Sequence, residues 1–156
     1  MQPSVSNMRH HCFVPALVVL LFASTASGQQ PEAVGRIKLV SGAVFLVRGD
    51  AQLQAQAGQL VYQSDRLRTG ADGSVGVALK DDTRVALGPA SEIRLDRFSY
   101  APAEGQLALV LRVVRGVVAY VSGRIAKLAP DAIRIETPAA ILGVRGTTLA
   151  IRIGDQ

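Results

Sequence analysis

Beyond residue 28 the sequence contains no cysteine, histidine, methionine or tryptophan. The only cysteine, Cys12, and both histidines, His10 and His11, lie before that point. Residues 29–156 therefore form no disulfide, so packing and backbone pairing must stabilise their fold. They also lack the nitrogen and sulfur ligands of metal sites and the usual base of nucleophilic catalysis. We expect no cofactor, no metal and no enzymatic activity, with a hydrolase as a remote alternative.

The first residues have the order of regions that marks an exported protein. Arg9 supplies positive charge, residues 13–23 form an apolar run, and small residues follow up to Gly28. A membrane-spanning helix needs roughly 20 apolar residues, and this run is shorter and contains proline. We expect a cleavable signal peptide over residues 1–28, cut after Ala26 or Gly28. The product is expected to be periplasmic or secreted, with no membrane span.

About 128 residues remain after cleavage, enough for one domain with its own core. Removal of Arg9 leaves 16 basic residues against 12 acidic ones, a net charge of +4. That charge is mild, and export separates the protein from nucleic acid, so we expect no nucleic-acid partner. The expected organisation is a linker over residues 29–34 and a single domain over residues 35–153. The sequence leaves the oligomeric state open.

Apolar and polar residues alternate in short runs along most of this domain, as in strands with one buried face. The runs cover residues 37–39, 75–80, 84–87, 93–96, 107–112, 133–136 and 149–153. Turn-forming residues separate them, and the best helical candidate, residues 51–57, is too short to form a helix alone. The pattern predicts an all-β fold: a twisted, solenoid-like stack of short strands or, alternatively, a two-sheet β-sandwich.

Two pairs of segments resemble each other within the chain. Residues 42–49 (GAVFLVRG) share a frame with residues 116–123 (GVVAYVSG), and residues 66–71 (RLRTGA) resemble residues 134–139 (RIETPA). The first pair is 74 residues apart and the second 68. Such echoes favour stacked strand units, in which each unit buries its face against the next.

Three longer segments resemble the FecR domain family: residues 66–79 (RLRTGADGSVGVAL), 85–93 (VALGPASEI) and 137–147 (TPAAILGVRGT). With the two glycine-led strands they occur in the family's order and cover roughly residues 35–151. The resemblance implies an all-β, solenoid-like fold. It also implies the periplasmic part of a regulator that receives a signal from an outer-membrane transporter and relays it to a cytoplasmic sigma factor.

The sequence departs from this family pattern in three respects. No cytoplasmic segment precedes the signal peptide, so the domain type is expected to carry over and the signalling circuit is not. Asp81-Asp82 replaces the usual Asp-Gly turn, and Leu149 stands where the family often has an aromatic residue. Asp81-Asp82 alone is also a weak start for a calcium site, which needs several spaced oxygen ligands.

The motif around Arg145 and Thr147 has two interpretations. It is a structural turn, with Arg145 paired to an internal acid such as Asp72, or Arg145 holds a carboxylate or sugar phosphate. Basic residues also occupy polar strand positions, where stacked strands would align some of them as a basic strip: Lys38, Arg66, Arg68, Arg84, Arg94, Arg112, Arg134 and Arg152. The candidate interaction residues are Arg145, Thr147, Arg66, Arg68 and Arg134.

These observations favour a non-catalytic FecR-like module of the cell envelope that binds or scaffolds an envelope protein. The alternative is a carbohydrate- or cell-wall-binding module that uses the basic strip to bind an anionic envelope polysaccharide. A plain solvated face that prevents sheet edges from aggregating explains the same charges without any ligand.

Overall fold

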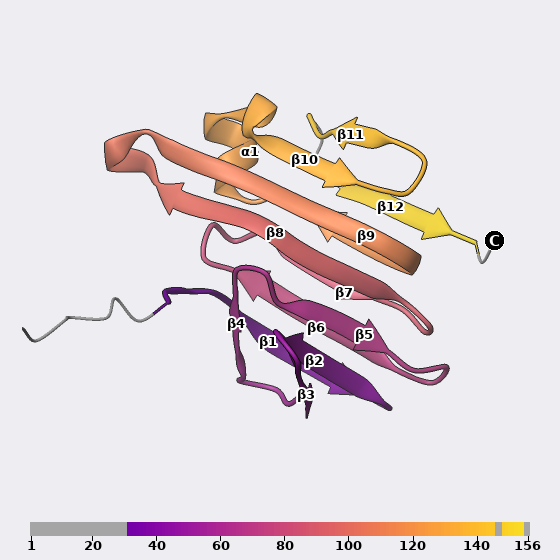
Figure 1. Ribbon diagram of the computed structural model, residues 1–156. Coiled ribbons are helices and arrows are strands. Elements are labelled where there is room, and N and C mark those ends of the chain that lie inside the picture. Colours follow the sequence, from indigo (N-terminus) through magenta and orange to yellow (C-terminus); the bar gives the residue numbers. More distant parts are fainter. Residues whose placement is uncertain (1–30, 146–147, 155–156) are drawn as a thin grey trace, which may run out of the picture. The chain divides into compact units, whose positions relative to one another are not determined.

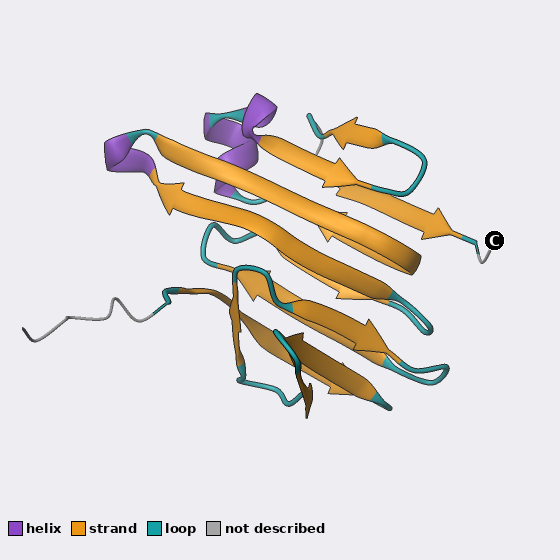
Figure 2. Cartoon of the chain, in the orientation of Figure 1, coloured by secondary structure: helices purple, strands orange, loops and turns teal. Residues whose placement is uncertain are grey.

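The computed structural model describes residues 31–145 and 148–154, and strands make up most of this part of the chain (Figure 1, Figure 2). The expected all-β fold is confirmed. The expected signal peptide lies outside the described residues, and so does Thr147. The first strand begins at Ala33, inside the segment expected to be a linker.

The strands and the short helical segments follow one another along the chain. The strands are β1 (Ala33–Ser41), β2 (Val44–Arg48), β3 (Ala51–Gln54), β4 (Leu60–Tyr62), β5 (Arg66–Thr69), β6 (Ser74–Leu79), β7 (Arg84–Leu87), β8 (Glu92–Ala101), β9 (Gln106–Val121), β10 (Ile133–Glu136), β11 (Ile141–Gly143) and β12 (Thr148–Ile153). The helical segments are η1 (Pro102–Glu104), α1 (Arg124–Leu128) and η2 (Pro130–Ala132).

The strands form one continuous ladder, which divides into two sheets that share β9. Sheet A has the order β4-β1-β6-β7-β9-β12, and sheet B has the order β3-β2-β5-β8-β9-β10-β11. Residues 106–115 of β9 pair with β8, whereas residues 116–121 pair with β12. Neighbouring strands are antiparallel except β9 and β10, which are parallel. One long strand therefore connects the two sheets (Figure 1).

The chain passes between the sheets at corners. β1 continues into β2 through Gly42, β5 into β6 through residues 70–73, and β7 into β8 through residues 88–91, while β9 bends at Gly116. Each strand pair joined in this way is one bent rung, and the rungs stack through backbone hydrogen bonds. The predicted twisted stack of short strands is confirmed. The inward faces of both sheets share one hydrophobic core, which includes Ile37, Leu46, Leu111 and Tyr120.

Close backbone contacts set the spacing of the corners. Gly42 has a φ of 64°, and a Cβ there would lie 2.3 Å from the carbonyl oxygen of Asp72 in the next corner. The Gly70 N–H donates to Ala43 O (2.8 Å), and the Ala90 N–H donates to Gly70 O (2.9 Å). Glycine is needed where neighbouring corners approach this closely, because a side chain would occupy the space of the adjoining backbone.

Two buried hydroxyls connect successive corners. The Thr69 hydroxyl donates to Gly88 O (2.7 Å) and accepts from the Ser91 N–H (2.9 Å). The Ser91 hydroxyl in turn accepts from the Val117 N–H (2.8 Å). The bend leaves backbone groups without ladder partners, and a buried N–H without an acceptor is costly, so these hydroxyls complete the hydrogen bonding.

The opposite ends of the rungs are joined by a buried carboxylate. Asp81 accepts from the Thr83 N–H (3.1 Å), the Thr83 hydroxyl (2.7 Å) and the Ile125 N–H (3.4 Å). Asp82, next to it, has a φ of 67° and forms an exposed ion pair with Arg124 (2.9 Å). An aspartate tolerates this left-handed conformation, which explains how the turn forms without the family's glycine.

Two sequence expectations about local structure have different outcomes: residues 51–57 form no helix, as expected, and only one of the two echoes is reproduced. The best helical candidate, residues 51–57, contains the edge strand β3, and the short α-helix α1 lies after β9 instead. Of the two echoes, the second is reproduced: β5 and β10 both lie in sheet B, flanking the β8–β9 hairpin. The first echo is not reproduced, because β2 lies in sheet B whereas the matching part of β9, residues 116–121, lies in sheet A.

Candidate functional site

The structure separates the predicted interaction residues into two groups on sheet B. Arg66 and Arg68 lie on β5, and Arg134 lies on β10. Arg145 follows β11, and Thr147 is outside the described residues. In the order of sheet B, the strands β8 and β9 lie between β5 and β10.

Strand register places three arginines in one row across sheet B. Arg66 of β5 is opposite Arg94 of β8, which is opposite Arg112 of β9. The next residue in the row is Glu136 of β10. Neighbouring strands are about 4.8 Å apart, so the row carries a closely spaced line of positive charge. We call Arg66, Arg94 and Arg112 the arginine row.

Acidic side chains neutralise part of this row. Asp96 pairs with Arg94 and with Arg112, whose Nε lies 2.9 Å from Asp96 Oδ2. Arg112 also donates to Glu136 Oε2 (2.8 Å). Burial acts to raise the pKa of Asp96, but the hydrogen bonds and charges of the two arginines outweigh it and lower that pKa below its ordinary value. Among the described residues, Arg66 and Arg68 have no acidic partner.

A shallow depression of about 460 Å³ opens beside Arg66, at the end of the row that lacks acidic partners. Arg66, Arg94 and Asp96 line it together with residues of the neighbouring loops, Gly49 and Ser64. The guanidinium of Arg66 has fork-shaped donors that suit a carboxylate or phosphate. In this depression Arg66 presents a positive charge that no acidic side chain among the described residues pairs with.

A second depression, of about 350 Å³, contains Arg134 and Arg145. Arg145 Nη2 lies 3.0 Å from Asp131 Oδ1, and both side chains are about four-fifths exposed. The proposed internal partner Asp72 lies elsewhere, where it accepts a long bond from the Ala43 N–H. An exposed pair such as Arg145–Asp131 contributes little stability, so Arg145 stays accessible to an anion.

The other members of the predicted basic strip lie on sheet A. Lys38 is on β1, Arg84 on β7 and Arg152 on β12, and each side chain is exposed. The strip expected from the sequence is thus divided between two sheets. Strand register, which alternation alone does not specify, decides which arginines are neighbours.

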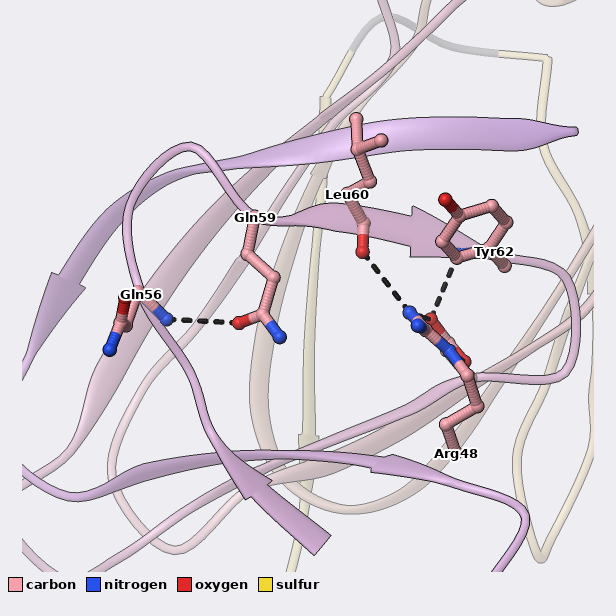
Figure 3. A network of polar contacts seen from close by, with 6 residues as sticks. Arg48, Gln56, Gln59, Leu60 and Tyr62 are labelled. Carbon is pink, nitrogen blue, oxygen red and sulfur yellow. Dashed lines mark hydrogen bonds and ion pairs between the residues drawn. The ribbon is translucent and has the colours of Figure 1, made fainter. Parts of the chain in front are cut away.

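A third polar cluster, which the sequence did not indicate, joins the end of β2 to β4 (Figure 3). Arg48 donates from Nε to Asp65 Oδ1 (2.8 Å) and from Nη2 to Oδ2 (2.7 Å), and Asp65 also accepts from the Tyr62 N–H (2.8 Å). The Arg48 guanidinium lies 4.4 Å from the centre of the Tyr62 ring and donates to Leu60 O (3.2 Å). The hydrogen bond that Arg48 donates to Asp65 raises the pKa of Arg48. With its carboxylate buried and fully bonded, this cluster is structural.

A protein-family model described as FecR protein matches residues 65–156, more than half of the chain. The chain belongs to the FecR family. FecR proteins form a regulatory signalling family that is typically associated with the cell envelope. The family is not known to be enzymatic. No curated protein and no solved structure matches the chain.

The FecR match begins at Asp65, so β1 to β4 precede it. These strands nevertheless belong to the same sheets, because β1 pairs with β6 and β2 pairs with β5. The FecR domain of this chain is therefore continuous with a preceding rung. In the described residues, no helix has the length and apolar character required to cross a membrane, and no cluster of acidic, histidine or cysteine side chains is arranged to hold a metal ion.

Proposed function

We propose that this FecR domain is a non-catalytic binding module of the cell envelope, exported on its signal peptide, that acts through contacts with another protein. The observation that carries the proposal is how the polar side chains are used. The buried polar and charged residues all bond to the fold itself: Asp65, Thr69, Asp81, Thr83 and Ser91. Arg66 and Arg68, by contrast, form no ion pair among the described residues, and β5 is paired on both sides, so the backbone that carries them is already ordered before binding.

A pull-down from periplasmic extract tests this function, with residues 29–156 carrying a C-terminal tag. Recovery of one protein in stoichiometric amount is the expected result. Recovery of glycan with no protein would overturn the proposal. Washing in increasing salt adds a second readout, because attraction between a basic face and an acidic partner weakens as salt screens the charges.

The arginine row favours a second candidate, a module that binds anionic envelope polysaccharide. A line of guanidinium groups crossing successive strands suits a linear polymer with repeating negative charge. Substitution of Arg66, Arg68 and Arg134 by alanine is expected to reduce retention on immobilised lipopolysaccharide. The matched control replaces Lys38, Arg84 and Arg152 of sheet A, which removes the same charge. Only Arg66 of this set belongs to the row, but all three arginines lie on sheet B. Equal losses in both triple variants would show that net charge, and not the arginines of sheet B, determines retention.

A further inference from the structure

The far edge of sheet A ends in a strand that has only one neighbour in the described structure. β12 pairs with β9 from Thr148 to Ile153 without a bulge, and no other described strand pairs with it (Figure 1). The other terminal strands of the sheets are shorter: β3 has 4 residues, and β4 and β11 have 3 each. β12 has 6 residues and contains neither proline nor lysine, the residues that usually protect an edge.

The hydrogen bonds of β9 identify which backbone groups of β12 are unpaired. Val117 directs its C=O to the Gly88 N–H (2.9 Å) and its N–H to the Ser91 hydroxyl (2.8 Å), both away from β12. Residues of an antiparallel strand alternate between their two neighbours. Val118, the next residue, therefore pairs with its opposite number Ile151. By the same alternation, the N–H and C=O groups of Thr148, Ala150 and Arg152 point to the open edge.

These groups specify an extended polypeptide as the ligand, because only a strand presents donors and acceptors at a matching interval. We propose that the β12 edge binds an extended segment of a partner protein, which adds a strand to sheet A. The proposal rests on the protein-binding function above and specifies the chemistry of the partner. On the inward side, the half-buried Leu149 and Ile153 call for apolar residues at alternate positions of that segment.

The charge of sheet A indicates which residues suit the outward-facing positions of the incoming segment. The strand residues of sheet A include four basic side chains, Arg36, Lys38, Arg84 and Arg152, and no acidic one. Arg152 is exposed at the open edge itself, so an acidic residue on the incoming strand would lie beside it. β12 itself contains no acidic residue, so a second copy of this strand would place no carboxylate beside Arg152. The partner is therefore a different chain, with apolar and acidic residues in alternation.

Amide hydrogen exchange of residues 29–156 tests the free edge first. The amides of Thr148, Ala150 and Arg152 are expected to exchange rapidly, while those of Leu149, Ile151 and Ile153 are protected by β9. Addition of a synthetic eight-residue peptide that alternates Val and Glu should slow the first three amides. The proposal would be overturned if those three amides were already protected in the chain alone. It would also be overturned if the peptide protected only amides outside β12.

Substitutions at the edge test the mode of binding. Ala150→Pro removes an outward N–H without touching the ladder to β9, and is expected to weaken peptide binding about fivefold to tenfold, the loss of one backbone hydrogen bond. Ala150→Val keeps the N–H and should bind as the unmodified chain does. Circular dichroism and retained protection of Ile151 show that the proline variant is folded. Equal affinity of the proline and valine variants contradicts strand addition.

Charge reversal provides a variant that leaves the backbone unchanged. The unmodified chain should prefer the Val–Glu peptide, whereas Arg152→Glu should prefer a peptide that alternates Val and Lys. An unchanged preference would refute the inference that the partner segment is acidic. The pull-down separates this inference from the function on which it rests. A protein recovered equally by the Ala150→Pro variant overturns strand addition alone, whereas recovery of no protein overturns the binding function.

Discussion

Replacement of Gly116 by alanine tests the role of the corners most directly. Gly116 lies within β9 where the strand changes sheets, and its φ is 86°. A Cβ at this position would lie 2.3 Å from Ser91 Oγ, 2.5 Å from Ser91 Cα and 2.7 Å from the carbonyl oxygen of Ala90. Two of these atoms belong to the backbone of the adjoining corner, so no side-chain rotation relieves the contact.

The expected cost has two components. A residue with a Cβ pays about 1–2 kcal/mol for the left-handed backbone conformation. Insertion of a methyl group into a filled space costs about 1–3 kcal/mol, because neighbouring atoms must move. The sum, about 2–5 kcal/mol, is a large fraction of the roughly 5–15 kcal/mol that stabilises a domain. Movement of Ser91 would also weaken its hydrogen bond to the Val117 N–H.

Urea unfolding of residues 29–156, followed by circular dichroism, measures this cost against two other glycines. Gly105 has a φ of 66° with no atom within 4 Å of an added Cβ. Gly105→Ala should therefore lower the free energy of unfolding only by the cost of the left-handed backbone conformation. Gly143 is equally open and its φ is not in the left-handed region, so Gly143→Ala should change stability little. If Gly116→Ala and Gly105→Ala lower the free energy of unfolding equally, contact between corners does not determine stability and the reasoning fails.

Three further substitutions are measured in the same way. Asp65→Asn should cost about 2–3 kcal/mol, near the lower end for a broken buried ion pair because Arg48 is partly exposed. Ser91→Ala should cost about 1–3 kcal/mol, since the Val117 N–H loses its acceptor. The pKa of Asp96 is lower in the folded than in the unfolded chain, so its stabilisation is present above the unfolded pKa of about 3.9 and is lost as pH falls through the folded pKa. Asp96→Asn should therefore lower stability at pH 7 and make little difference at strongly acidic pH.

Each of these expectations has an outcome that contradicts it. The control for Asp65→Asn is Asp82→Asn, at an exposed ion pair, which should lower the free energy of unfolding by less than about 1 kcal/mol. If both substitutions cost the same, burial of the Asp65 carboxylate is unimportant. A neutral Ser91→Ala would mean that water or a shifted backbone replaces the hydroxyl. A destabilisation by Asp96→Asn that is constant with pH would exclude the carboxylate charge as its cause.

The strands themselves were predictable because alternation is a local property. Val75, Val77 and Leu79 alternate with small or polar residues, and the structure buries them on one face of β6. The Asp72-Gly73 turn and Ser91 lie within the segments that resemble the family, residues 66–79 and 85–93. Their roles depend on tertiary contacts, because Gly73 lies against the Ala43 carbonyl and the Ser91 hydroxyl accepts from the Val117 N–H. A motif shows that a turn is present, but it does not show what the turn contacts.

The candidate site was predicted in part. Arg66, Arg94 and Arg112 belong to the strip expected from the sequence, yet Lys38, Arg84 and Arg152 proved to lie on the other sheet. Nothing in the sequence indicated that Asp96 would neutralise two of the three arginines in the row. The buried pair of Arg48 and Asp65 was missed because its members are 17 residues apart and no local pattern connects them.

The class of fold and the family could be read from the amino-acid sequence, because they follow from local periodicity and motif order. The tertiary structure decided which strands are neighbours, which glycines are corners and which edge of the sheet is open. The physical reason is that strand pairing depends on contacts between distant residues: a shift of one residue in register would place a different set of side chains on each face. The division of β9 between two sheets, set by the bend at Gly116, is the clearest case.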